Sequence, residues 1–415
     1  MFVNSVQESC RCLAEDDDTL DKLEQESFDV AVVDNSFSNC RYLVPHRLQI
    51  PWITYAVATF PHFIRVPMLL SYVPHPLSPF SDKMTFVERL KNTAEVFIIF
   101  FLWKWYSPNP PHDVMEKFRH YGHFSSLDEL ALKSILWLMI TDDVLGYPQP
   151  MMPNMVSIAG LTVKRSTGKL PTDIRNFIDG AEKGVILVTF GTMISYIPPD
   201  TVETFSSVFG QLDGYRVIWR LDNRDSVRIP ANVMIAHWLP QNDILAHPSV
   251  KLFITHCGNN GQYEAIYHGV PMIGFPVSAD GFHNAKRLDH KGFGLSMNIH
   301  DFTADQLLDN IHKILGDKMY KERVMKASEI FRSQVQSPVE RATFWIEHVC
   351  RFGGGHLRSA GNDLPLYSYF MLDILAFVII FFLLIICVTY MTIKFTVYKC
   401  CGRMTSNNSW QKKKE

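Results

Sequence analysis

Short apolar runs separated by polar segments recur along the chain, and they predict buried parallel strands. The first run is FDVAVV at residues 28–33, followed by Asp34, and the second is IPWITY at residues 50–55. Short runs rich in β-branched residues are typical of strands buried on both faces of a sheet. Residues 38–48 are long enough for a crossover helix, so this region predicts a βαβ unit.

After the proline-rich stretch 148–153 the pattern becomes a regular alternation of strands and helices. Strands are predicted at 155–158, 184–190, 216–220, 233–236, 252–255 and 272–275, with helices between them, for example at 199–212 and 261–268. This rhythm indicates an α/β domain with a doubly wound parallel sheet. Residues 60–150 are instead rich in aromatic and helix-period apolar residues, which predict a helical region beside an apolar pocket.

One apolar segment near the C-terminus is long enough to cross a bilayer as a helix. Residues 374–393 are 20 consecutive uncharged residues, with acidic residues before them and basic residues after them. The positive-inside rule therefore predicts a cytosolic tail at 394–415 and a luminal body at 1–373. The apolar run 96–103 is too short to span and predicts a buried or interfacial helix.

Both chain ends add to the predicted membrane topology. Lys412–Lys414 before Glu415 resemble a dilysine signal for retrieval to the endoplasmic reticulum, although a solvated basic tail is the competing interpretation. Residues 1–20 contain no apolar core of an export signal, so a luminal body predicts a segment upstream that this chain lacks.

Charge and cysteine content exclude some classes of protein. Forty basic and 42 acidic residues give a net charge of -2, so no overall field favours nucleic acid. The eight cysteines show neither zinc spacing nor the density of a disulfide scaffold, and they leave the redox compartment open.

The strongest candidate for chemistry is the turn HCGNNG at residues 256–261, between a predicted strand and a predicted helix. Such a turn presents free backbone N–H groups and the positive end of a helix, which suit a diphosphate. Gly and Asn also occur in such turns for geometry alone. Three neighbours favour the phosphate interpretation: Trp238 could stack on a base, Glu264 could accept ribose hydroxyls, and Asp280 could bind sugar hydroxyls.

The segment His237–Gly292, HWLPQNDILAHPSVKLFITHCGNNGQYEAIYHGVPMIGFPVSADGFHNAKRLDHKG, resembles the signature of the membrane-bound UDP-glucuronosyltransferases and related UDP-glycosyltransferases of animals. The resemblance extends over QPMMPNMVSIAGL at 149–161, the turn at 190–193, Trp219-Arg220 and the segment leading into the membrane span. It covers nearly the whole chain, more weakly between residues 60 and 140.

The resemblance implies a GT-B-like fold: two Rossmann-like domains, the first incomplete, followed by a transmembrane helix. The implied organisation is a partial acceptor-binding domain at 1–150, a UDP-sugar-binding domain at 151–350, a juxtamembrane segment at 351–373, the span and the tail. By the same resemblance Asp34 is the catalytic aspartate, and the donor site needs neither a cofactor nor a metal. The residues that the resemblance assigns to the UDP-sugar are Thr192, Arg220, Trp238, Gln241, His256, Gly258, Asn260, Gly261, Glu264 and Asp280.

Two departures from the family pattern matter. The family has Asp-Gln where this chain has Asp280-Gly281, which removes a side chain that contacts the sugar and leaves the donor sugar open. The family's catalytic histidine belongs to a segment upstream of Met1, and His46 is placed on the crossover helix, where it is not expected to face the cleft.

These observations lead to one expected function and one alternative. We expect an inverting, metal-independent glycosyltransferase of the endoplasmic reticulum membrane that moves glucuronic acid or another hexose from a UDP-sugar to a small lipophilic acceptor. The alternative is an inactive form that binds UDP-sugar, or that pairs with full-length relatives and regulates them. A dinucleotide-binding dehydrogenase is disfavoured because no GxGxxG follows an early strand. The acceptor and the oligomeric state stay open.

Overall fold

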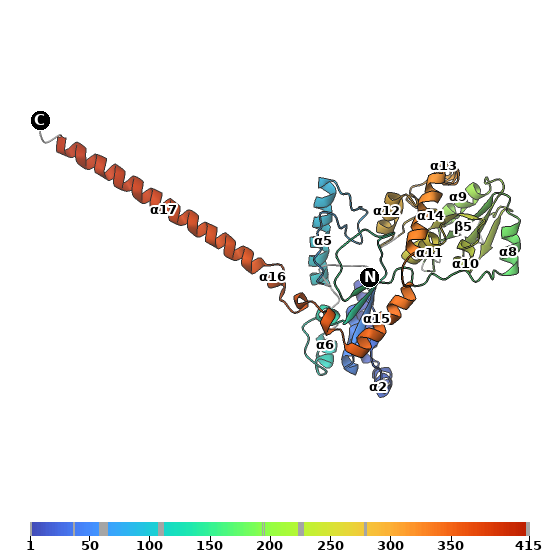
Figure 1. Cartoon of the computed structure of the whole chain (residues 1–415), viewed down its shortest axis with the longest axis horizontal. Coiled ribbons are helices and arrows are strands. Elements are labelled where there is room, and N and C mark those ends of the chain that lie inside the picture. The colour runs from blue at the N-terminus through green and yellow to red at the C-terminus, as the bar shows by residue number, and fades with distance from the viewer. Residues whose placement is uncertain are drawn as a thin grey trace. The chain divides into compact units, whose positions relative to one another are not determined.

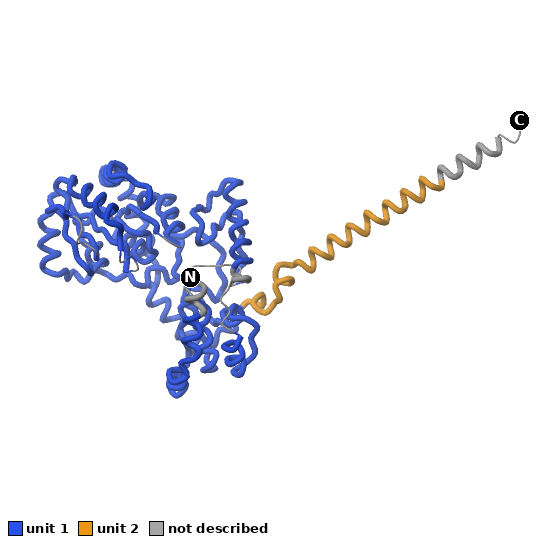
Figure 2. The backbone as a smooth tube through the Cα atoms, turned by 180° about the vertical axis from the view of Figure 1, so that it is seen from behind, with its two compact units in different colours: residues 1–358 blue, residues 359–415 orange. Residues whose placement is uncertain are grey.

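The structure is a computed structural model with two units, Met1–Arg358 and Ser359–Glu415 (Figure 2). It describes residues 2–35, 38–57, 65–106, 112–192, 194, 196–222, 228–277 and 280–411, without the side chains of 2–7, 103–106 and 400–411. Met193 of the turn at 190–193 and the dilysine tail at 412–415 lie outside the described residues.

The first sheet of unit Met1–Arg358 has four parallel strands in the order β1-β2-β3-β4. They are β1 (Ala31–Asp34), β2 (Trp52–Ala56), β3 (Leu136–Met139) and β4 (Met155–Ser157). The predicted βαβ unit is confirmed, with η1 (Asn39–Tyr42) and α3 (Leu43–Leu48) as its crossover. β3 lies in the region that we expected to be helical, because LWLM is too short a run to be separated from its helix-period surroundings.

Helices from both ends of this unit cover the first sheet. One side is packed by α1 (Phe2–Glu15), α2 (Asp17–Gln25), α6 (His112–Arg119) and α7 (Leu127–Leu132), and a disulfide joins Cys10 to Cys40. The other side is covered by α15 (Pro338–Phe352) (Figure 1). Its Ala342 and Val349 belong to one buried apolar cluster with residues of the sheet, including Ile53 of β2. The first sheet therefore depends on a helix that follows the second sheet in sequence.

The second sheet has six parallel strands in the order β10-β9-β8-β5-β6-β7, which confirms the predicted doubly wound topology. The strands are β5 (Gly184–Thr189), β6 (Tyr215–Arg220), β7 (Val233–Ala236), β8 (Val250–Thr255), β9 (Met272–Gly274) and β10 (Gly294–Ser296). The helices around it are α8 (Thr172–Asp179), α9 (Pro199–Phe209), α10 (Gln241–Leu245), α11 (Asn259–Tyr267), α12 (Gly281–Lys291), α13 (Ala304–Gly316) and α14 (Lys318–Arg332).

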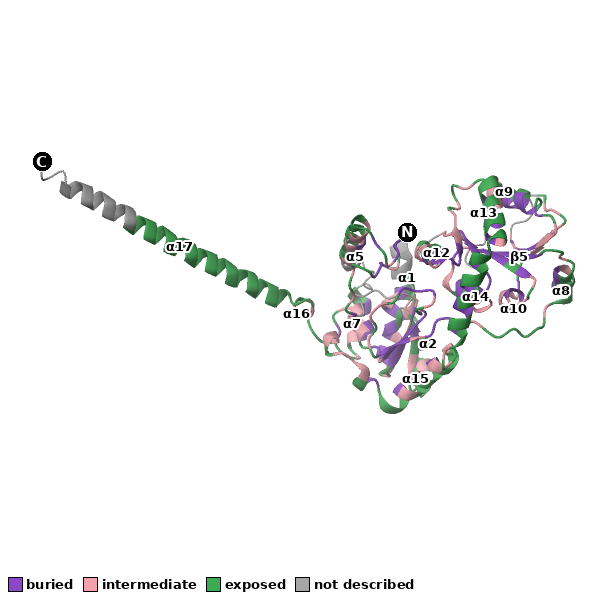
Figure 3. Ribbon diagram, turned by 45° about the horizontal axis from the view of Figure 1, so that its top comes forward, coloured by how far each residue is buried: buried purple, intermediate pink, exposed green. Residues whose placement is uncertain are grey.

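Strand β5 is buried on both faces, as its unbroken apolar sequence requires. Val185 and Leu187 point into a core shared with α8, α11, α12 and α14, whereas Ile186 and Val188 point into a core shared with α9 and α13. Figure 3 shows β5 buried between these helices. Because both faces of β5 are buried, the position of this strand, which leads into the candidate site, is fixed by packing.

Unit Ser359–Glu415 consists of η3 (Ala360–Asn362), α16 (Leu366–Tyr369) and the long helix α17 (Leu372–Gln411); η2 (Gly355–Leu357) precedes it. Within α17, Leu372–Lys399 is long and apolar enough to cross a membrane, and it contains the predicted span 374–393. The run 96–103 lies in α5 (Phe86–Tyr106), where Phe97, Ile98 and Phe101 are exposed and Val96 is buried. It is therefore not a buried core helix.

The hydroxyl groups of Tyr42, Thr54 and Ser134 are buried and hydrogen-bonded in a row, and they provide a test of the packing of the first sheet. Thr54 Oγ1 shares a hydrogen bond of 2.9 Å with the hydroxyl of Tyr42 and donates one of 2.8 Å to Ser134. Thr54→Val keeps the shape but leaves the Tyr42 hydroxyl without this partner, so we expect the free energy of unfolding to fall by about 1–3 kcal/mol. Urea unfolding of the detergent-solubilised chain measures it. The partly exposed Thr204→Val is the control, with a change within about 0.5 kcal/mol; an equal loss in both variants would contradict the assignment.

Candidate functional site

The candidate site begins where strands β5 and β8 lie side by side. From β5 the chain proceeds to β6 and β7 on one side, and from β8 it proceeds to β9 and β10 on the other. Thr189 pairs with Thr255 at the carboxyl ends of these two strands. Ligands of doubly wound sheets bind at such a topological switch point, because the loops after the two strands diverge and leave a crevice.

The loops that follow β5 and β8 approach each other around His256. Gly191 has φ 76°, and a Cβ atom there would lie 2.6 Å from His256 Cε1. A Cβ atom at Gly258 would lie 2.4 Å from Nε2 of the same ring. Both glycines are therefore needed for the close approach of the two loops. Thr192, next to Gly191, is exposed.

His256 is an unprotonated side chain near neutral pH. Burial lowers its pKa, and the negative charge of Asp280 opposes that effect. Its Nδ1 atom is buried and has no hydrogen-bond partner among the described residues. A neutral imidazole has one donor and one acceptor nitrogen, and the tautomer decides which nitrogen has which role.

The turn after His256 leads directly into α11. Gly258 is the N-cap residue of this helix, and no side chain caps its first N–H groups. Asn260 is exposed in the first turn. Cys257 has φ 66°, a strained conformation for a residue with a side chain, and its carbonyl accepts a 2.9 Å hydrogen bond from Asn284 Nδ2. The turn is thus held in a shape that exposes the helix N-terminus.

A second group of site residues lies along α10 and α11. Gln241 Nε2 donates a 2.5 Å hydrogen bond to Glu264 Oε2, and it lies 3.4 Å from where a Cβ on Gly261 would be. Burial raises the pKa of Glu264, and the Gln241 hydrogen bond opposes that rise. Trp238, between β7 and α10, is 71% exposed. An exposed indole can stack on a base, and a carboxylate can accept hydrogen bonds from ribose hydroxyls.

Arg220 connects loops rather than facing open space. Its guanidinium donates to the carbonyl of Gly191, to the carbonyl of His237 at 3.0 Å, and to Asp222 in an ion pair of 3.1 Å. The side chain at the end of β6 therefore fixes the turn after β5 and the segment that carries Trp238. This placement agrees with a supporting role in the pocket.

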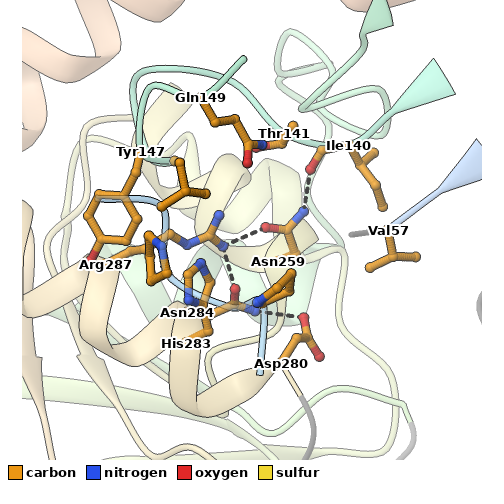
Figure 4. Close-up of a pocket in the computed structure, with 14 residues that line it drawn as sticks. Val57, Ile140, Thr141, Tyr147, Gln149, Asn259, Asp280, His283, Asn284 and Arg287 are labelled. Carbon is orange, nitrogen blue, oxygen red and sulfur yellow. Dashed lines mark hydrogen bonds between the residues drawn. The ribbon is translucent and has the colours of Figure 1, made fainter. Parts of the chain in front are cut away.

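A cavity of about 60 Å³ lies where the loops after β2 and β3 meet the start of α12. Val57, Ile140 and Thr141 line it from the first sheet, and Asp280 lines it from the residue that caps α12 (Figure 4). Asp34 ends β1, and it pairs in register with Tyr55 of β2. Asp34 therefore belongs to the same edge of the sheet as the cavity wall, one strand away.

His46 lies at the opposite edge of the first sheet. It is buried in α3, where its Nε2 atom is 3.1 Å from the carbonyl oxygen of Gly122, and burial lowers its pKa. It lines a different pocket together with Trp52, the first residue of β2. The sequence-based view of His46 as a packing residue agrees with this placement.

Sequence reasoning missed three polar side chains that organise the cavity: Asn259, Asn284 and Arg287. Arg287 Nη2 donates to the side-chain oxygens of both asparagines, Asn259 donates to the carbonyl of Ile140 at 3.0 Å, and Asn284 donates to Asp280 at 2.8 Å (Figure 4). Residues 280, 284 and 287 follow the helical spacing of one face of α12. This spacing in the sequence could have indicated that Asn284 and Arg287 lie on the same side of the helix as Asp280.

Comparison with known proteins agrees with this geometry. The family model described as UDP-glucoronosyl and UDP-glucosyl transferase matches residues 1–407. Human UDP-glucuronosyltransferase 1A9 is 33% identical over 408 residues, covering 95% of this chain and 73% of the relative. Rat 2-hydroxyacylsphingosine 1-beta-galactosyltransferase is 34% identical over 362 residues, covering 86% and 66%.

Solved structures establish the likeness in fold. The spinosyn forosaminyltransferase SpnP superposes with a TM-score of 0.59 at 15% identity, covering 81% of this chain and 79% of that one. The glycotransferase of kitacinnamycin gives a TM-score of 0.56 at 22% identity, covering 80% and 79%. The expected GT-B architecture is confirmed.

The half-buried Glu264 carboxylate predicts a pH-dependent stability. The pKa of this carboxyl in the folded state is raised above its ordinary value of 4.5, so the folded state binds the proton more tightly than the unfolded state does. The free energy of unfolding therefore falls progressively as the pH rises from the ordinary pKa through the raised one. Glu264→Gln removes the charge and keeps an oxygen for Gln241. We therefore expect this variant, without nucleotide, to melt at a higher temperature than the wild type at pH 7, with the difference vanishing as pH falls to 4. Thermal melting of both chains across this range is the measurement; a pH-independent difference would contradict the role of the charge.

Proposed function

The chain belongs to the UDP-glucoronosyl and UDP-glucosyl transferase family, and from this premise we propose that it moves a sugar from a UDP-sugar to a small lipophilic acceptor, with inversion at the anomeric carbon. The observation that carries the proposal is the convergence of Gly191, His256 and Gly258 at the switch point between β5 and β8. This convergence supplies backbone and imidazole groups at one place, where a diphosphate would bind.

We propose one orientation for the donor. The uracil stacks on Trp238 near Gln241, and the ribose hydroxyls donate to Glu264. The diphosphate lies against Thr192, His256, Gly258, Asn260 and Gly261, while Arg220 holds the surrounding loops and Asp280 binds the sugar. Fixed donors around the diphosphate stabilise the leaving group as its negative charge develops.

Metal ligands do not enter this proposal. Within the described residues, no group of three or more His, Cys, Asp or Glu side chains could hold a metal ion. The proposal assigns the leaving-group charge to the loop N–H groups and to the side chains of Thr192, His256 and Asn260.

The acceptor side is assigned to the carboxyl edge of the first sheet. Val57 and Ile140 give the cavity an apolar wall, which suits a lipophilic acceptor. Asp34 would orient and stabilise a general base that takes the proton of the acceptor hydroxyl. Holding the two substrates in one cleft contributes the proximity part of the rate enhancement.

We place the enzyme in the endoplasmic reticulum membrane, with unit Met1–Arg358 in the lumen. The apolar stretch Leu372–Lys399 supports a single span. The disulfide between Cys10 and Cys40 supports the orientation, because disulfides persist in oxidising compartments.

A second candidate function is donor binding without transfer, alone or as a partner that regulates full-length relatives. The arrangement around Asp34 favours it: the carboxylate lies 3.7 Å from Arg41 Nη1, and the same guanidinium donates to the backbone oxygen of Asp34 at 2.8 Å. An arginine paired with this carboxylate competes with a catalytic base for it.

Replacing Trp238 tests the nucleotide site. Stacking on a base contributes about 1–3 kcal/mol, so Trp238→Ala should weaken UDP binding roughly fivefold to 150-fold. Calorimetry with the solubilised full chain measures UDP affinity, and transfer to phenolic and steroid-like acceptors is assayed on the same samples. Phe344→Ala, another exposed aromatic residue, is the control. Failure of the wild-type chain to bind UDP would refute the proposal, whereas UDP binding without transfer would support the second candidate.

Restoring a glutamine at position 281 tests the sugar subsite. A Cβ atom on Gly281 would come no closer than 3.6 Å to the carbonyl of His256 and to Pro276, so the backbone tolerates a side chain there. We expect Gly281→Gln to bind at least one UDP-sugar about 2- to 12-fold more tightly, with UDP affinity unchanged, because one hydrogen bond to the sugar is gained. Titration of UDP, UDP-glucose, UDP-glucuronic acid and UDP-N-acetylglucosamine measures it. Gly316→Gln, in open space on α13, is the control; an equal change in UDP affinity would place residue 281 away from the sugar.

A further inference from the structure

The segment that joins the two sheets, residues 161–170, is attached to the second sheet's α10 by side-chain hydrogen bonds. This connecting segment runs from β4 of the first sheet towards α8 of the second, and residues 161–170 contain no helix or strand. Leu161, Val163 and Leu170 pack against apolar cores, whereas residues 164–169 are exposed. The exposed part buries little apolar surface, so its position depends on the hydrogen bonds that it forms.

Asn242 holds the connecting segment through both polar atoms of its side-chain amide. Its Nδ2 atom donates a 2.9 Å hydrogen bond to the carbonyl of Lys164, and its Oδ1 atom accepts a 3.4 Å hydrogen bond from the N–H of the same residue. His268, the residue that ends α11, has its Nε2 atom 3.1 Å from the same Oδ1 atom. Burial lowers the pKa of His268 to about 4, so the ring is neutral near pH 7 and can donate from Nε2. Asn242 thus connects Lys164 to the end of α11.

Asp243 holds the next residues of the connecting segment. Its Oδ1 atom accepts hydrogen bonds from the N–H of Thr167 at 2.7 Å, from the hydroxyl of Thr167 at 3.2 Å and from the hydroxyl of Ser166 at 3.1 Å. Hydrogen bonds to an ionised acceptor are stronger than those between neutral groups. Two adjacent residues of α10 therefore attach residues 164–167 from one side.

The same two helices carry residues that we assign to the nucleotide. Gln241 begins α10 directly before Asn242, and its side chain donates to Glu264 of α11. The carbonyl of Glu264 accepts a 3.1 Å hydrogen bond from the N–H of His268. A short series of hydrogen bonds therefore leads from the residues assigned to the ribose to the connecting segment.

We propose that Asn242 and Asp243 are positioning residues that couple donor binding to the attachment of the connecting segment, and so to the link between the donor and acceptor sides. The proposal rests on the proposed transferase function, because it takes Gln241 and Glu264 as nucleotide contacts. A nucleotide that orders α10 and α11 binds more tightly when the segment is attached than when it is released. By linkage, attachment strengthens UDP binding by the same factor by which UDP strengthens attachment.

Trypsin cleavage measures release of the connecting segment, because Lys164, Arg165 and Lys169 are exposed within it. Mass spectrometry of the full chain in detergent gives the cleavage rate at these three residues with and without UDP. The protease concentration is kept low enough that the segment reattaches faster than it is cut. We expect saturating UDP to slow cleavage of the wild-type segment about 5- to 20-fold, which is an ordinary size for coupling between two sites. Calorimetry measures UDP affinity on the same samples.

Two variants release the segment without changing a residue assigned to the nucleotide. In Asn242→Ala and Asp243→Ala we expect faster cleavage without UDP and a ratio of rates with and without UDP that approaches one. Their loss of UDP affinity should not exceed the protection factor of the wild-type chain. Asp243→Asn keeps an oxygen acceptor and should keep part of the protection. Gln211→Ala, which removes an exposed side-chain hydrogen bond elsewhere on the second sheet's helices, is the control and should behave as the wild type.

The outcomes separate this proposal from the transferase function. UDP binding with no change in cleavage of the wild-type segment overturns the coupling, needs no variant, and leaves the transferase function intact. Variants that are cut faster but are still protected by UDP as strongly as the wild type also overturn it, because Asn242 and Asp243 then only hold the segment. A wild-type chain that binds no UDP refutes the transferase function, and the coupling with it.

Discussion

The lateral pairing of β5 with β8 is the constraint on which the site depends. These strands are distant in sequence, and their hydrogen bonds bring Thr189 beside Thr255, so the turn at Gly191 meets the turn at His256. Apolar burial on both faces of β5 fixes that register, because Val185 and Ile186 enter different cores. Packing in the interior thus sets the distance between loops at the surface.

The fold was largely predictable because its signals are local. Apolar runs such as 184–190 and 252–255 identify strands without knowledge of their neighbours, and the residue resemblance supplied their order. The exceptions were β3 and β10, whose short sequences carry too little periodicity to separate them from the adjacent segments. The packing of α15 on the first sheet was also missed, since amphipathic spacing shows that a helix has a buried face but not which sheet receives it.

The candidate site was predictable by residue type but not by interaction. Trp238, Glu264 and His256 could be named from the motif, yet the partners of Arg220 and Arg287 depend on loops that converge only in three dimensions. The sequence also could not indicate that Asn259 reaches across to the carbonyl of Ile140. This contact links the loop after β8 to the loop after β3 through one amide side chain.

The position of α15 has a consequence for biosynthesis. Ile53 enters its core early in the chain, but Ala342, which covers that face, is added only after the whole second sheet has been made. At ordinary synthesis rates of about 5–20 residues per second, the apolar face of the first sheet waits on the order of tens of seconds for its cover. During this interval the nascent chain exposes a surface that chaperones would recognise. The first sheet therefore completes its packing only after α15 has been synthesised.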